Sequence, residues 1–271
     1  MILVSIRALL LFFSFVFLDN SVKTVLSEDL NESNYTLGVR FQIPKLTFVH
    51  HDNSEIKKIL ENYAFQYPDI TRVYNLGTST RGKDILAIEI TDLPGIHEPG
   101  EPEVKLVGNI HGNEVVGREV LLHFIAYMLE NYKENHFIRN MINSVRLHIV
   151  PTLNPDGYDY SVVGDCAGVR GRGNANGFDL NRNFPDRFDF NNNRKKLQSE
   201  TISIMKWTKS IPFVLSASFH GGALVANYPY DNNHNMISKY SPAPDVQVFK
   251  FISMIYSKVC SKSQVILLSF L

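Results

Sequence analysis

Apolar residues recur along the 271-residue chain with two different periods. Stretches with apolar positions three and four residues apart predict helices, because one face of a helix repeats every 3.6 residues. Short apolar runs bounded by glycine, proline or asparagine predict strands. Helices are expected at 54–66, 116–132, 195–209 and 245–259, and strands at 72–76, 85–90, 104–110, 145–150, 213–219 and 224–228.

Strands and helices thus alternate, which predicts an α/β domain with a mostly parallel or mixed sheet covered on both faces. The segment 77–82 is typical of a hairpin connection, and 151–157 is rich in turn residues and is expected to be a loop. In such sheets ligands bind outside the carboxyl ends of the strands. The residues directly after each strand are therefore the first place to look for chemistry.

The N-terminal part of the chain indicates secretion. After a short positively charged start, the apolar run 8–18 is too short to span a bilayer and is typical of a signal peptide, with a buried helix as the alternative. Cleavage is expected near 20–27, and two glycosylation sequons follow at Asn31 and Asn34. We therefore expect a secreted or secretory-pathway protein in which residues 1–27 are the signal peptide and its flank.

Lysine plus arginine and aspartate plus glutamate are balanced at 27 each, so no nucleic-acid partner is expected. The two cysteines, Cys166 and Cys260, either form one disulfide in an oxidising compartment or stay unpaired. Two thiols cannot complete a structural zinc site with four ligands. A metal centre in this chain must therefore use histidine and carboxylate ligands.

The sequence His111-Gly-Asn-Glu114 directly follows the strand expected at 104–110. Imidazole nitrogen and carboxylate oxygen both bind Zn²⁺ at about 2.0–2.2 Å. The small, turn-prone residues between them let the backbone bend both side chains onto one ion. The pair is a candidate for two zinc ligands, and a polar turn without a metal is the alternative interpretation.

His220 follows the strand expected at 213–219 and is the natural third ligand. Catalytic zinc sites commonly have three protein ligands and keep one position for water. The alternative for His220 is a hydrogen-bonded histidine at the edge of the sheet. The remaining histidines lack such a placement and are expected on the surface or in the core: His50, His51, His97, His123, His136, His148 and His234.

The stretch 164–193 has little periodicity, and its central part, 171–185, is dense in arginine and asparagine. Long irregular loops in compact domains usually have a function. Guanidinium groups bind carboxylates in bidentate fashion, and asparagine adds an amide donor. A carboxylate-binding pocket next to the metal is therefore expected, which would select the last peptide bond of a chain. A solvated basic loop is the alternative.

The chain resembles the zinc metallocarboxypeptidases, and among them carboxypeptidases E, M, N and D. The motifs that carry the resemblance are GNIHGNEVVGRE (108–119), VPTLNPDGYD (150–159), GRGNANGFDLNRNFPD (171–186) and SASFHGGALVANYPYD (216–231). Motifs of this length and order leave little room for coincidence. The resemblance covers about residues 40–260 and implies a mixed eight-stranded sheet flanked by helices.

The same resemblance implies one bound Zn²⁺ ion with three ligands: His111, Glu114 and His220. Asn181 and Arg182 match the pair that binds the substrate's terminal carboxylate, and Arg172 matches the arginine that polarises the scissile carbonyl. Asp231 matches an acidic residue in the specificity pocket of enzymes that remove C-terminal lysine or arginine. The implied partners are peptides or proteins with a free C-terminus. We expect a monomer, and tethering to a membrane stays open.

One part of the family pattern is missing. The family's general-base glutamate lies well beyond the third zinc ligand, but the last glutamate of this chain is Glu200. Residues 263–271 look unrelated to the family and are expected to form a separate tail. We therefore expect a metallocarboxypeptidase domain at 28–262 that is incomplete at its C-terminus, and poor or no turnover by this polypeptide.

Three functions stay open. The first is a secreted zinc carboxypeptidase. The second is a non-catalytic protein that binds zinc and peptide C-termini. The missing glutamate favours the second for this exact polypeptide, whereas the intact metal and carboxylate sites favour the first for its gene. The third is a related zinc hydrolase that acts on small acylated amino acids. Asp231 and the long loops favour peptide substrates instead.

Overall fold

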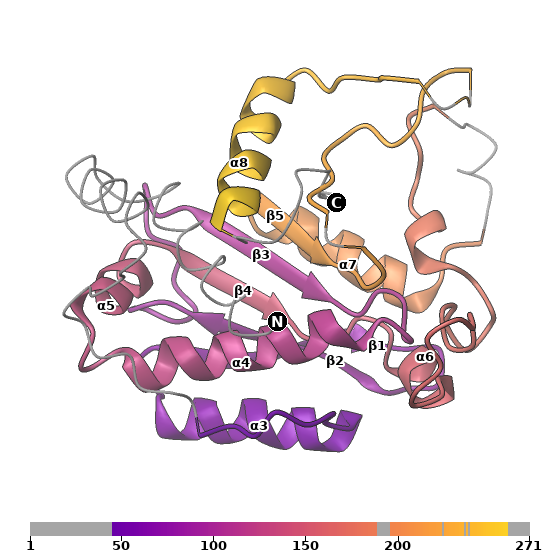
Figure 1. The fold of residues 1–271 in the computed structure, drawn as a ribbon. Helices are drawn as coiled ribbons and strands as arrows, with labels where there is room; N and C mark the ends of the chain where they lie inside the picture. Colours follow the sequence, from indigo (N-terminus) through magenta and orange to yellow (C-terminus); the bar gives the residue numbers. More distant parts are fainter. Residues whose placement is uncertain (1–44, 189–195, 224, 236, 238, 260–271) are drawn as a thin grey trace.

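A mixed sheet of five strands organises the part of the chain that the structure describes (Figure 1). The structure is a computed structural model and describes residues 45–188, 196–223, 225–235, 237 and 239–259. The strands are β1 (Thr71–Thr78), β2 (Asp84–Ile90), β3 (Glu103–Gly108), β4 (Arg146–Val150) and β5 (Phe213–Phe219). Their order across the sheet is β1-β2-β4-β3-β5.

Strand direction decides where the site can form. β2 runs antiparallel to both β1 and β4, whereas β3 runs parallel to its two neighbours, β4 and β5. Parallel neighbours end at the same edge of a sheet. Gly108, the last residue of β3, accordingly pairs with Phe219, the last residue of β5. Residues that follow these two strands are therefore brought together.

Helices cover both faces of the sheet. They are α3 (Asn53–Gln66), α4 (Val115–Asn131), α5 (His136–Ile142), α6 (Pro155–Tyr160), the 3₁₀ helix η1 (Leu180–Arg182), α7 (Ser199–Ser210) and α8 (Val246–Val259). Side chains of α3, α4, α5 and α8 share one apolar cluster, and α7 belongs to a second cluster on the other face (Figure 1). Successive strand residues point to opposite faces, so Leu106 joins the first cluster and Val107 the second.

The outer side of α4 is covered by the segment 45–52, which precedes α3. His51 Nδ1 lies 2.8 Å from Glu119 Oε2 in a buried pair. Nearby, the ring of Phe48 stacks on that of His123 with 4.0 Å between centroids. These contacts place His51 and His123 in the interior, one of the two surroundings expected for histidines outside the metal motif.

The α/β class and the mixed sheet flanked by helices are confirmed, with five strands in the described residues where the family implies eight. The strand expected at 224–228 does not form in residues 225–228, where Ala226 makes an isolated bridge. Two glycines precede this segment and Pro229 follows it, which disfavours an extended ladder. Leu224 lies outside the described residues.

Helix boundaries differ from the prediction where an asparagine side chain accepts a hydrogen bond from a backbone N–H near the start of a helix. The helix expected at 195–209 begins at Ser199, because Gln198 is extended and its N–H donates to Asn183 Oδ1 at 2.8 Å. The expected loop 151–157 contains the start of α6, which Asn154 caps by accepting from Gly157 N–H at 2.9 Å. Helix α5 was not predicted, although Asn135 caps it in the usual way.

Several predictions concern residues outside the described part of the chain. The signal peptide, the two sequons, the tail 263–271 and Cys260 all lie there, whereas Cys166 is described and exposed. A disulfide between the two cysteines therefore stays a prediction. Among the helices that the structure describes, none has the length and apolar character needed to cross a membrane.

Candidate metal centre

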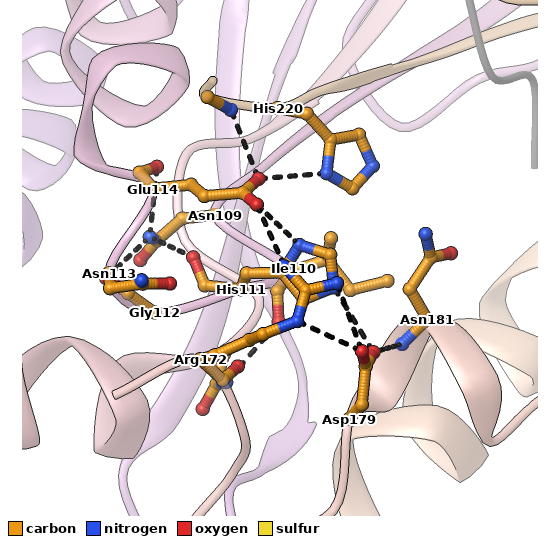
Figure 2. Close-up of polar contacts among 12 residues, drawn as sticks. Asn109, Ile110, His111, Gly112, Asn113, Glu114, Arg172, Asp179, Asn181 and His220 are labelled. Carbon is orange, nitrogen blue, oxygen red and sulfur yellow. Dashed lines mark hydrogen bonds and ion pairs between the residues drawn. The ribbon is translucent and has the colours of Figure 1, made fainter. Parts of the chain in front are cut away.

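The candidate site lies where β3 and β5 end side by side (Figure 2). His111 and Glu114 belong to the turn between β3 and α4, and His220 directly follows β5. One ligand atom of each residue lies within 4.8 Å of the ligand atoms of the other two. The parallel arrangement of the two strands thus unites residues that are far apart in the sequence.

Glu114 lies at the centre of this group. Its Oε1 is 2.8 Å from His111 Nδ1, and its Oε2 is 2.8 Å from His220 Nδ1. The backbone N–H of Gly221 also donates to Oε2 at 3.0 Å. Both histidines therefore present the same ring nitrogen to one small region, as ligands of a shared ion would.

The charge state of Glu114 suits a metal ligand. Burial alone would raise the pKa of its carboxyl group, but hydrogen bonds with His111, His220 and Gly221 outweigh burial and bring this pKa below its usual range. The carboxylate is therefore the form present near neutral pH. Metals bind the deprotonated form of their ligands.

Two glycines allow the elements around the site to pack closely. A Cβ on Gly112 would lie 2.1 Å from the backbone of α6, and a Cβ on Gly117 would lie 2.6 Å from the Cβ of Phe219. Any larger residue would push these elements apart. Gly117 therefore lets the first turn of α4 touch the end of β5, which keeps Glu114 beside His220.

Asp179 is a residue of the site that the sequence analysis missed. Its Oδ1 lies 3.1 Å from His111 Nε2 and accepts the N–H of Asn181 at 2.9 Å. A carboxylate behind a ligating histidine fixes the orientation and tautomer of the ring. Burial would raise the pKa of Asp179, but the neighbouring His111 and Arg172 lower it. The available signal was a single acidic residue in the otherwise basic loop 171–185.

Arg172 contacts the carboxylates on both sides of His111. Its Nη1 lies 3.2 Å from Glu114 Oε1, and its Nη2 lies 3.0 Å from Asp179 Oδ2. The side chain is 36% exposed, so the guanidinium is held by two anions yet reaches solvent. The structure thus brings Arg172 to Glu114, one of the three candidate ligands, and to Asp179, which contacts His111.

Asn181, Arg182 and Asp231 lie further out. Asn181 touches the group through its backbone N–H to Asp179, and its carbonyl accepts from Arg182 Nη1 at 3.1 Å. The side chains of Arg182 and Asp231 are 61% and 90% exposed and 3.9 Å apart. Exposed pairs of this kind contribute at most about 1 kcal/mol, so both side chains are available to a ligand.

The donor set has the chemistry of a catalytic zinc site. Two imidazole nitrogens and one carboxylate oxygen are a common protein ligand set for Zn²⁺, with a further position left for water or substrate. Asp179 supplies the outer carboxylate that such histidines usually have. The residues present therefore fit a zinc ion. An α/β fold with this donor set at the carboxyl ends of its strands is typical of a zinc hydrolase.

Comparison with known proteins gives the family. The family model described as zinc carboxypeptidase matches residues 56–265. Carboxypeptidase D of Mus musculus is 49% identical over 211 residues, which cover 78% of this chain and 15% of that protein. The carboxypeptidase N catalytic chain of Rattus norvegicus is 41% identical over 242 residues, with 79% and 53% covered. The crystal structure of thrombin activatable fibrinolysis inhibitor is similar with a TM-score of 0.62 at 17% identity, covering 81% of this chain and 59% of that one.

The chain belongs to the zinc carboxypeptidase family, which confirms the resemblance seen in its motifs. Relatives named carboxypeptidase D, N and M match the expected group, and carboxypeptidase M of Mus musculus is 42% identical over 79% of this chain. The chain spans about half the length of carboxypeptidases N and M and 15% of carboxypeptidase D.

Proposed function

We propose that the protein is a zinc-dependent carboxypeptidase that removes C-terminal residues from peptides or proteins. The observation that carries the proposal is the convergence of His111, Glu114 and His220, whose ligand atoms lie within 4.8 Å of one another. These three side chains would hold one Zn²⁺ ion, and catalytic zinc sites with three protein ligands commonly bind a water or substrate as the fourth. Membership of the zinc carboxypeptidase family supports this choice of metal and reaction.

The surrounding residues have distinct tasks in this reaction. A zinc ion supplies Lewis-acid chemistry, because it polarises a carbonyl oxygen and lowers the pKa of water. Asp179 accepts a hydrogen bond from His111 Nε2 at 3.1 Å and so directs the Nδ1 lone pair toward the metal position. Arg172, which contacts Glu114, stabilises the negative charge that develops on the scissile carbonyl oxygen.

Substrate selection falls to the outer residues. Asn181 and Arg182 bind the terminal carboxylate of the peptide, for which a guanidinium is well shaped. Holding that carboxylate fixes which peptide bond lies at the metal. Asp231, 3.9 Å from Arg182, pairs with the side chain of a C-terminal lysine or arginine. The support for this preference is the negative charge and the exposure of Asp231.

A protein that binds zinc and peptide C-termini without hydrolysing them efficiently is the second candidate. This candidate concerns the 271-residue polypeptide by itself, in which residues 221–271 contain no glutamate. Hydrolysis needs a group that takes a proton from water and passes it to the leaving amine. Asp231 is shorter than glutamate and serves the specificity pocket in this proposal. The two candidates share the metal and carboxylate sites and differ in turnover.

We also propose that the protein is secreted. The apolar run 8–18 and the sequons at Asn31 and Asn34 support this proposal. The domain assigned to 28–262 and the separate tail at 263–271 stay predictions, as does a monomeric state. The balance of 27 basic and 27 acidic residues supports partners other than nucleic acids.

Replacing His220 by alanine tests the metal assignment. We expect the zinc content of the purified protein to fall well below one ion per chain, because two ligands rarely retain Zn²⁺ against a competing chelator. His50→Ala removes an exposed histidine of the segment 45–52 and is the matched control, with full zinc content expected. Equal zinc content in the two variants would refute the site and the chemistry built on it.

A further inference from the structure

Asn109 links the end of β3 to the turn that carries His111 and Glu114 (Figure 2). Its φ is +58°, and within the described residues it is the one non-glycine residue with positive φ. Side chains other than asparagine and aspartate adopt this left-handed conformation with difficulty. Such backbone strain persists only where the surroundings hold it, and it is concentrated at functional sites. The contacts of the Asn109 side chain explain what holds it here.

The amide of Asn109 faces three backbone carbonyls. Its Nδ2 donates to the carbonyl oxygens of His111 at 2.8 Å, Gly112 at 3.0 Å and Glu114 at 3.3 Å (Figure 2). Two N–H hydrogens serve three acceptors, so one hydrogen is shared. The Oδ1 accepts from Thr152 Oγ1 at 2.9 Å, which fixes the orientation of the amide. The side chain is fully buried, so these bonds are not exposed to competition from solvent.

Two of the three carbonyls belong to proposed zinc ligands. A turn between a strand and a helix has few backbone partners, and here Glu114 N–H donates to His111 O at 3.0 Å. The Asn109 amide adds the contacts that hold both ends of the turn at one point. Asn154 holds the two residues that precede the turn. Its N–H donates to Asn109 O at 3.1 Å, and its Nδ2 donates to Ile110 O at 3.2 Å.

We propose that Asn109 is a positioning residue for the metal centre, because its amide fixes the backbone from which His111 and Glu114 project toward His220. This inference rests on the proposed zinc site. Aspartate at 109 would have the same shape but no N–H, so it would turn a carboxylate oxygen toward three carbonyl oxygens. Glycine at 109 would adopt the positive φ without strain but would remove the side-chain donor shared by the three carbonyls, of which that of His111 keeps the Glu114 N–H.

The test measures zinc affinity in the full chain by competition with a chromogenic chelator, for the wild type, Asn109→Asp and Asn109→Gly. Asn131→Asp is the matched control, since Asn131 is equally buried in α4 and donates to the carbonyl of Tyr127 at 2.9 Å, in the last part of the helix. Loss of an outer partner of a metal ligand typically weakens metal affinity about 10–100-fold. We expect a loss in that range for both variants at 109 and wild-type affinity for the control.

Thermal unfolding of the metal-free proteins separates positioning from general stability. The control is expected to lower Tm without changing zinc affinity, whereas the variants at 109 weaken zinc binding beyond any effect of their Tm. The absorption bands of the Co²⁺-substituted protein should also shift in the variants at 109, because they report ligand geometry. If Asn109→Asp does not fold, Asn109→Gly decides the question.

Folded variants at 109 with wild-type zinc affinity and an unchanged Co²⁺ spectrum would overturn the inference and leave the zinc site standing. An equal loss of affinity in the Asn131→Asp control would also overturn it, because the effect would then be one of stability. If the wild type binds zinc no better than His220→Ala, the proposed function fails. This comparison needs no variant at 109, so the two failures are distinguishable.

Discussion

Replacing Glu103 by glutamine is expected to destabilise the protein strongly. Glu103 begins β3 and is 1% exposed. Its Oε1 lies 3.0 Å from Arg146 Nη1 and 2.7 Å from His97 Nδ1, and its Oε2 lies 2.7 Å from His148 Nε2. Arg146 also donates from Nε to Glu89 Oε1 at 2.6 Å. This buried charged network, formed by Glu89, Glu103, Arg146 and His148, joins β2, β4 and β3.

The partners of His148 fix the direction of its hydrogen bonds. The Trp207 indole can only donate, and it does so to the Tyr74 hydroxyl oxygen at 2.9 Å. The Tyr74 hydrogen is then available to His148 Nδ1, 2.8 Å away. Because the Glu103 carboxylate can only accept, His148 Nε2 donates to it at 2.7 Å. Glutamine at 103 would offer one acceptor oxygen to donors that now share two.

The magnitude follows from burial. Removing one partner of a buried ion pair costs about 3–5 kcal/mol, because the remaining charge stays desolvated. Glu89 continues to neutralise Arg146 in the variant, so we expect a loss near the lower end, about 3 kcal/mol. The total free energy of unfolding of a domain is about 5–15 kcal/mol, so a loss of this size is readily measured.

Urea unfolding at pH 7 is the assay, with Asp84→Asn as the control. Asp84 pairs with Lys57 at 2.9 Å on the surface, and both side chains are more than one third exposed. Loss of an exposed pair costs about 0–1 kcal/mol. A loss under about 1 kcal/mol for Glu103→Gln, with an unchanged dependence on urea, would refute the reasoning from burial.

The same network predicts the pH dependence of stability. Burial would raise the pKa of both carboxyls, but hydrogen bonds with Gly95 and two arginines for Glu89, and with His148 and His97 for Glu103, bring each pKa below its usual value. A carboxyl with a lowered pKa in the folded state stabilises the protein above its unfolded pKa of about 4.3. This stability is lost as the pH falls through the lower, folded pKa. Glu103→Gln should therefore lose less stability between pH 5 and pH 3 than the wild type.

Two further predictions concern substrate and turnover. Arg182→Ala should abolish affinity for peptides with a free C-terminus and leave affinity for C-terminally amidated peptides nearly unchanged, and equal losses for both would show that Arg182 does not bind the carboxylate. The 271-residue polypeptide should hydrolyse peptides ending in lysine or arginine very poorly, because a positioned general base contributes about 10²–10⁴-fold and residues 221–271 contain no glutamate. Efficient turnover that disappears in His111→Ala would contradict this and require another base.

Local patterns were sufficient to predict most elements and the three candidate ligands. An apolar run followed by His111 or His220 marks the end of a strand, and parallel strands end at a common edge, so the convergence of the two histidines could be predicted without coordinates. The strand expected at 224–228 shows the limit of such patterns, because the described residues 225–228 form only an isolated bridge and an apolar run forms a strand only where a neighbour pairs with it.

Contacts that depend on strand order could not be predicted. Glu89, Glu103 and Arg146 are neighbours because β4 lies between β2 and β3, and no local pattern encodes that order. The contact of Asp179 with His111 likewise depends on how an irregular loop folds back on the end of β3. In both cases an acidic residue stood in an unusual place, either within an apolar strand or in a basic loop. Such a residue indicates a specific partner but does not say which residue the partner is.

The two ends of β3 have different tasks. Glu103 lies at its start within the buried charged network, and Asn109 follows its end beside the proposed metal ligands. Asn109 lies six positions after Glu103, roughly 20 Å along the strand, and changes at sites more than about 10 Å apart usually act independently. Glu103→Gln should therefore lower stability without weakening zinc binding, whereas Asn109→Asp should weaken zinc binding beyond its effect on stability. The pairing of β3 with its neighbours fixes the start of the turn. In the proposal, the hydrogen bonds of the Asn109 amide then fix the backbone of His111 and Glu114 relative to that start.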